Sequence, residues 1–195
     1  KANHPNLTIN TLVREGKVYK QIIEVSQTYA CDSIVMGFSG ASGMERFMGS
    51  TTTRVLKSSE VPVVIVKDVR SNIKYEKIVL PIDLTKESRQ KVDWAIHMAK
   101  QYNSEIHVIM EIEKDEFLAK RLKASLKQVE NILAKNGVKY TSKILDDIEY
   151  PEHFGKDVVQ YSEEISADLI MIMTQKETGV QDYLRIGSFA RHIIH

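Results

Sequence analysis

The sequence predicts an α/β fold, in which helices cover both faces of an open parallel sheet. Two observations carry this prediction: short β-branched segments alternate with segments of helical period, and two parts of the chain repeat one another. The 195 residues include 27 lysines and arginines and 26 aspartates and glutamates, which leaves a net charge of +1. This balance gives no electrostatic reason to expect nucleic acid or an acidic membrane as a partner.

Cysteine content and hydropathy narrow the class of protein further. The single cysteine, Cys31, excludes an internal disulfide framework. We find no signal peptide and no apolar run long enough to suggest a membrane-spanning helix. We therefore expect a cytoplasmic protein.

The elements of the first part of the chain follow from periodicity. Val18, Ile22 and Val25 fall on one helical face, and SIVMG (residues 33–37) is a continuous apolar run typical of a buried strand. VPVVIV (residues 61–66) is β-branched, which favours a strand. The predicted order is helix 18–29, strand 33–37, helix 50–59 and strand 61–66, followed by a polar linker at 67–77.

The second part continues the same alternation. A long amphipathic helix carries leucine and valine on one face from Leu118 to Leu133, and Gly137 suits the left-handed residue that follows such a helix. The predicted elements are strand 77–83, a helix around 92–99, strand 105–112, the long helix, strand 139–145, helix 157–165, strand 168–174 and the start of a helix at 187–195.

An internal repeat relates the two parts. CDSIVMG and GSTTTRVLKSS resemble ADLIMIM and GSFARHIIH, so that Asp32 pairs with Asp168 and Gly49–Ser50 with Gly187–Ser188. The offset of 136 to 138 residues is the length of one α/β domain. By this offset each copy lacks one end, and we expect both copies to be incomplete in this chain. The alternative is a chance similarity between two βα units.

The stretch GFSGASGMERFMGS (residues 37–50) joins a predicted strand to a predicted helix. Open α/β sheets bind ligands at the carboxyl ends of their strands. Glycines let the backbone approach a ligand closely, and the N–H groups of a helix start attract an anion, to which Ser50, Thr51 and Thr52 would add hydroxyl groups. The stretch is thus a candidate phosphate-binding loop. The alternative is a surface loop with a helix N-cap at Ser50.

Two known loop motifs do not fit this stretch. A P-loop requires Lys after the last glycine, where Ser50 stands, and a nucleophile elbow requires glycine where Ala41 stands. Because neither a P-loop lysine nor the Asp and Asn set of a kinase is evident, a phosphoryl-transfer enzyme ranks below a binding protein.

The same residues resemble the nucleotide-binding signature of the universal stress protein family, which is GxxG, about nine residues, and then Gly followed by Ser or Thr. Gly37 and Gly40 match GxxG, and Gly49–Ser50 match the closing pair, although eight residues rather than nine separate Gly40 from Gly49. KIVLPID resembles the first strand of the family, whose last residue, here Asp83, faces the adenine. The resemblance covers nearly the whole chain.

The resemblance implies a Rossmann-like fold in two tandem copies. Residues 1–70 would be the C-terminal half of a first domain, and residues 71–195 a second domain that lacks its last strand. It also implies a regulator of the stress response that binds ATP or a related adenine nucleotide, with or without Mg²⁺. The residues that would line the phosphates are Gly37, Gly40, Gly49, Ser50 and Thr51.

The second copy departs from the family pattern. Counting forward from Asp168 or back from Gly187 places no glycine at the GxxG positions, so side chains would crowd the phosphates. We expect this copy to bind nucleotide weakly or not at all. Its remaining candidate residues are Asp83, Gly187 and Ser188.

Two functions stay open at this stage. One is a nucleotide-dependent regulator that is no enzyme beyond slow ATP hydrolysis. The other is a scaffold that binds no nucleotide and acts by pairing of domains. Residues 61–66 would form an edge strand with apolar residues on both faces, and such an edge favours association. We therefore expect a homodimer or pairing of the two copies within the chain.

Overall fold

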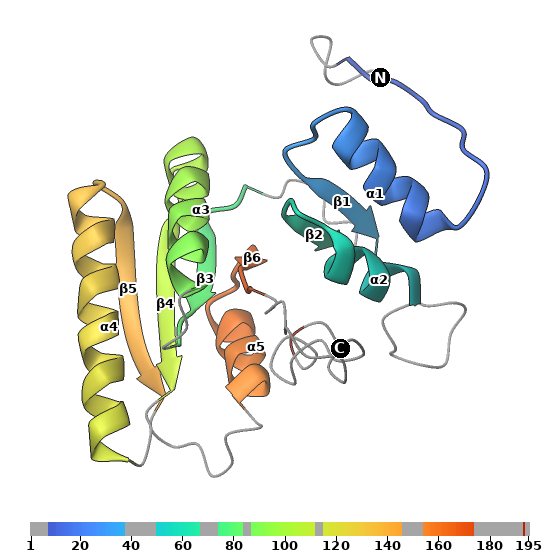
Figure 1. The fold of residues 1–195 in the computed structure, drawn as a ribbon. Helices are drawn as coiled ribbons and strands as arrows, with labels where there is room; N and C mark the ends of the chain where they lie inside the picture. The colour runs from blue at the N-terminus through green and yellow to red at the C-terminus, as the bar shows by residue number, and fades with distance from the viewer. Residues whose placement is uncertain are drawn as a thin grey trace. The chain divides into compact units, whose positions relative to one another are not determined.

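The computed structural model describes residues 8–37, 50–66, 74–83, 87–111, 115–145, 154–173 and 193. The chain forms two compact units, Lys1–Asp68 and Val69–His195. Figure 1 shows that each unit combines parallel strands with helices. The predicted α/β fold in two tandem copies is confirmed, whereas the exact limits of the copies stay a prediction.

The first unit contains two parallel strands and two helices. Strand β1 pairs with β2 in a register that runs from Ile34 opposite Val63 to Gly37 opposite Val66. Pro62 has no N–H group to donate and precedes the strand, but its carbonyl oxygen still accepts a hydrogen bond from the N–H of Ile34 at 2.9 Å. The elements are α1 (Val18–Thr28), β1 (Ile34–Gly37), α2 (Ser50–Ser58) and β2 (Val63–Val66).

The second unit is built around a four-stranded parallel sheet in the order β5-β4-β3-β6 (Figure 1). Each step from one strand to the next in sequence passes through a helix, as parallel pairing requires. The elements are β3 (Lys77–Pro81), α3 (Glu87–Tyr102), β4 (Glu105–Glu111), α4 (Glu116–Lys135), β5 (Lys139–Leu145), α5 (Phe154–Glu164) and β6 (Leu169–Ile170).

Side chains alternate between the two faces of this sheet. Ile106, Val108 and Met110 of β4 join the cluster that α3 and α4 cover, while Ile109 joins the cluster that α5 covers. All four of these side chains are fully buried. Because both faces are apolar, both must be covered by helices, and β4 reads as a continuous apolar run rather than an alternating one.

The predicted boundaries differ from the observed ones at α5 and β6. Helix α5 begins at Phe154 instead of residue 157, because Phe154 packs against the same apolar cluster as Val158. Strand β6 covers two residues of the predicted 168–174. Hydrogen bonds from the N–H groups of Asp168 and Met171 to the carbonyls of Lys77 and Val79 extend its contact with β3. Of the helix predicted at 187–195, only residue 193 is described.

The two units share a helix-to-strand turn. Ala30 follows α1 with φ of 46°, and Ser166 follows α5 with φ of 53°, 136 residues further along the chain. In each turn the next N–H group, that of Cys31 or Ala167, donates to the carbonyl of a buried helical serine at 2.8 Å. This is a Schellman motif, which satisfies the last carbonyls of a helix. A left-handed residue with the same type of hydrogen bond also follows α3 at Asn103 and α4 at Gly137, so this motif is a common helix ending among the described helices.

The left-handed residue of this motif costs stability wherever it carries a side chain. We expect Ala30→Gly and Ser166→Gly each to raise the free energy of unfolding by about 0.5–1 kcal/mol. Glycine removes the strain of the left-handed conformation, and this gain exceeds the loss that comes from the greater entropy of the unfolded chain. Gly137, which follows α4 with φ of 69°, is the matched control, and Gly137→Ala should lower stability. Urea denaturation measures all three variants, and a loss of stability in both glycine variants would contradict the assignment.

Candidate functional site

The glycine-rich stretch is bracketed by two described elements. Gly37 is the last residue of β1, and Ser50 and Thr51 are the first two residues of α2. Gly40 and Gly49 lie outside the described residues. The stretch thus leaves the carboxyl end of a parallel strand and leads to the amino end of a helix, which is where ligands bind to open α/β sheets.

The two ends of the stretch have the chemistry of an anion site. Gly37 is exposed, and among the described residues, its chain neighbours aside, no heavy atom lies within 4 Å of the position that a Cβ atom would occupy. Ser50 is exposed and Thr51 half-buried, and the first turn of α2 contains no acidic residue. Because N–H groups and the helix dipole make this end of a helix electropositive, an anion beside it meets no competing carboxylate from that turn.

By the repeat, the counterpart of the glycine-rich stretch follows β6 and lies outside the described residues, whereas the carboxyl end of β3 is described. Asp83 follows this strand and is exposed, whereas Gly187 and Ser188 lie outside the described residues. β3 pairs with β4 on one side and with β6 on the other. From β3 the chain adds β4 and β5 on one side of the sheet and then returns to add β6 on the other side of β3. The topological switch point of this sheet therefore lies at β3, the strand that Asp83 follows.

Lys91 of α3 lies buried at the same end of β3. Its side chain is 5% exposed, and its ammonium group donates a hydrogen bond to the carbonyl oxygen of Pro81. Burial lowers the pKa of Lys91 to about 8, and the nearby carboxylate of Asp83 partly offsets this effect. The second unit therefore holds a poorly solvated cation beside the residue that the family resemblance places against adenine.

The helical period of the sequence contains a signal for the burial of Lys91, which the sequence analysis above did not identify. Lys91 stands four residues before Ala95 and directly before Val92, so it falls on the apolar face of its helix. A lysine on such a face must either extend its charged end to solvent or find a polar partner. The carbonyl of Pro81 is that partner.

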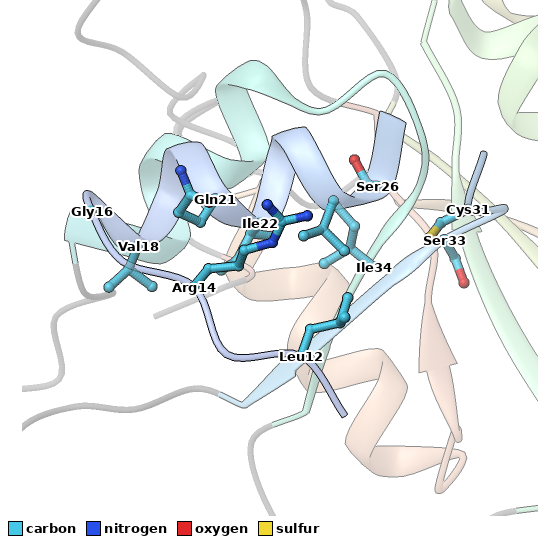
Figure 2. Close-up of a pocket in the computed structure, with 11 residues that line it drawn as sticks. Leu12, Arg14, Gly16, Val18, Gln21, Ile22, Ser26, Cys31, Ser33 and Ile34 are labelled. Atoms are coloured by element: carbon cyan, nitrogen blue, oxygen red, sulfur yellow. The ribbon is translucent and has the colours of Figure 1, made fainter. Parts of the chain in front are cut away.

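A separate pocket of about 390 Å³ opens in the first unit between α1, the segment before it and the start of β1 (Figure 2). Ile22 and Ile34 contribute apolar side chains, and Arg14 and Cys31 contribute polar ones. Ile34 begins β1 and Ser33 directly precedes it, whereas the glycine-rich stretch follows the carboxyl end of this strand. The pocket is therefore distinct from the predicted phosphate site.

Metal-binding clusters and membrane-spanning helices are both absent from the described residues. Among them, no group of three or more His, Cys, Asp or Glu side chains is arranged to hold a metal ion. In the same part of the chain, no helix combines the length and apolar character that a bilayer span needs.

Comparison with known proteins identifies the family to which the chain belongs. The sequence pattern of the Universal stress protein family matches residues 1–67 and 74–195. The chain belongs to the universal stress protein family, and the match in two segments agrees with the two units of the structure.

Two relatives show how far the similarity extends. Universal stress protein MJ0531 of Methanocaldococcus jannaschii is 27% identical over 135 residues, which cover 62% of this chain and 76% of that protein. A universal stress protein from Archaeoglobus fulgidus DSM 4304 superimposes with a TM-score of 0.67 at 27% identity, and the match covers 90% of this chain. This chain spans 60% of the length of that structure.

A shorter match supports the fold alone. A second universal stress protein structure from Archaeoglobus fulgidus is 22% identical with a TM-score of 0.52, and the match covers 62% of this chain and 86% of that one. At this identity the likeness concerns the arrangement of strands and helices and carries no statement about a ligand.

Lys91 offers a test of the electrostatics at the second unit. We expect Lys91→Met to raise the free energy of unfolding at neutral pH by about 1–3 kcal/mol, because it removes a buried ammonium at the cost of one hydrogen bond to Pro81. The folded chain releases this proton near pH 8 and the unfolded chain near 10.5, so the gain should shrink as the pH rises between these values. Denaturation of both proteins across this range measures it. Exposed Lys123→Met is the control, and a gain that does not depend on pH would contradict the account.

Proposed function

We propose that the first unit binds an adenine nucleotide, ATP or a close relative, and that the protein acts as a nucleotide-dependent regulator in a stress response. The observation that carries the proposal is the position of Gly37 at the carboxyl end of β1 and of Ser50 and Thr51 at the start of α2, with a glycine-rich stretch between them. Membership of the universal stress protein family supports the biological setting.

Each predicted residue has a role in this proposal. The backbone N–H groups of Gly37, Gly40 and Gly49 approach the phosphates, which no side chain at those positions obstructs. Ser50 and Thr51 add the N–H groups of the helix start and two hydroxyl donors. Mg²⁺ can accompany the phosphates, but the proposed contacts of these five residues with the phosphates do not depend on a metal ion.

The second unit has the weaker site in this proposal. Asp83, Gly187 and Ser188 are the residues that it retains of the family pattern. Lys91 places a cation beside Asp83, so the carboxylate is already engaged electrostatically. The division into residues 1–70 and 71–195, as parts of a first and a second domain, belongs to this proposal, as does a cytoplasmic location.

The proposal is one of binding rather than catalysis. The first turn of α2 supplies no carboxylate that could act as a general base, and Gly49 is followed by Ser50 rather than by a P-loop lysine. Any hydrolysis of the nucleotide is slow in this account.

A second candidate function, a scaffold that acts by pairing of domains, rests on β2. All four residues Val63–Val66 are apolar and half-buried, and within the described residues β1 is the strand that pairs with them. One of the two outer strands of the other sheet, β5, instead presents exposed Lys139 and Lys143, which discourage pairing at that edge. Association through β2, in a homodimer or between the two copies, is compatible with nucleotide binding.

Calorimetric titration of ATP into the purified chain tests the nucleotide proposal. We expect saturable binding that Gly49→Glu abolishes, because a carboxylate would enter the phosphate site and repel the ligand. Gly187→Glu makes the same change at the equivalent position of the second copy and should leave binding intact. No binding by the unmodified chain, or equal loss in both variants, would contradict the proposal and leave the scaffold function ahead.

A further inference from the structure

The pocket of the first unit, which we call the Arg14 pocket, is a candidate site that the proposed nucleotide site does not use. It lies between α1, the segment before this helix and the start of β1. Its volume of about 390 Å³ falls within the range of small-molecule sites. Figure 2 shows Leu12 and Arg14 reaching from the segment before α1 towards Ile34 of β1. Side chains from three separate parts of the chain thus converge on one space.

A glycine turn places the segment that carries Leu12 and Arg14. Gly16 has φ of 126°, a backbone conformation that residues with a side chain rarely adopt. Two residues further on, the chain enters α1 at Val18. The position of the segment beside α1 is therefore set by backbone geometry as well as by side-chain packing.

The walls of the Arg14 pocket are mainly apolar and incompletely covered. Leu12 is 47% exposed and Val18 is 61% exposed. Ile22 and Val25 of α1 are half-buried, whereas Ile34 is buried. A ligand that covers the exposed parts of these side chains removes apolar surface from water, which favours a ligand with a hydrocarbon body.

Arg14 is the single charged residue among the described residues that line this pocket. In the part of the chain that the structure describes, no carboxylate pairs with its guanidinium. A guanidinium binds a carboxylate through two parallel hydrogen bonds. Because the described lining supplies one positive charge, it matches a ligand with one negative charge better than a phosphate dianion.

We propose that the Arg14 pocket binds a small aliphatic carboxylic acid, such as a medium-chain fatty acid. The carboxylate pairs with Arg14, and the hydrocarbon body packs against Leu12, Ile22 and Ile34. Because Arg14 is exposed, the ion pair adds little affinity by itself, and burial of the hydrocarbon supplies most of the binding free energy. The proposal does not depend on nucleotide binding, since the glycine-rich stretch follows the opposite end of β1.

Protection of Cys31 from alkylation tests whether the pocket is occupied. Cys31 is the single cysteine of the chain and lines the pocket, so its reaction with iodoacetamide reports on this site alone. We expect octanoate to slow the reaction by about tenfold at a concentration about ten times its dissociation constant, because about a tenth of the pockets then stay empty. Unchanged alkylation at every octanoate concentration would overturn the proposal.

Arg14→Met tests the ion pair, because methionine keeps an apolar side chain and removes the charge. Calorimetric titration should show that this variant binds octanoate about fivefold more weakly than the unmodified chain, and that both bind the uncharged octanamide equally. Lys20→Met removes a positive charge from α1 at a residue that does not line the pocket, and it should change neither affinity. An equal effect of the two substitutions on octanoate would overturn the proposal.

Leu12→Glu and Val13→Glu make the same change at neighbouring residues and separate binding from folding. Both side chains are exposed, Val13 at 95%, so a carboxylate at either position costs little stability. Leu12 lines the pocket, and Val13 is not among its lining residues. We expect Leu12→Glu to abolish octanoate binding, because its carboxylate repels the ligand, and Val13→Glu to leave binding intact. Binding that survives in Leu12→Glu, or that is lost equally in both variants, would overturn the proposal.

Discussion

Parallel pairing of the strands is the constraint from which the rest of the structure follows. Parallel neighbours need a crossover connection, so a helix separates consecutive strands within each unit and all strands of a sheet end at the same edge. In the first unit this edge carries Gly37 of β1, and in the second it carries Asp83 after β3. Both candidate nucleotide sites are thus consequences of one topology.

The described parts of the two copies share one helix–turn–strand segment, α1 to β1 in the first and α5 to β6 in the second. Ala30 and Ser166 adopt the same left-handed conformation in equivalent turns, and the carbonyls of Ser26 and Ser162 accept the equivalent hydrogen bonds from these turns. At the carboxyl edges, the glycine-rich stretch follows β1 of the first copy, and Asp83 follows β3 of the second copy, where the buried Lys91 feels its charge.

Local sequence accounts for most of the fold and for less of the sites. The strands β1 to β5 were predictable because apolar, β-branched runs stand between helical segments. The burial of Lys91 was not predicted, because periodicity treats lysine as polar and β3 and α3 must pack before Pro81 becomes its partner. The contact between His107 and Tyr161 joins residues 54 apart, so no local spacing predicts it.

The central claim is that nucleotide binds at the carboxyl edge of the first unit. Amide chemical shifts of the isotope-labelled chain, followed by NMR during addition of ATP, test it most directly. The account predicts changes concentrated at Gly37, Ser50 and Thr51, with the amides of β3 and α3 unaffected at ligand concentrations that saturate the first unit. Changes centred on Asp83 and Lys91 instead, or none at either edge, would contradict it.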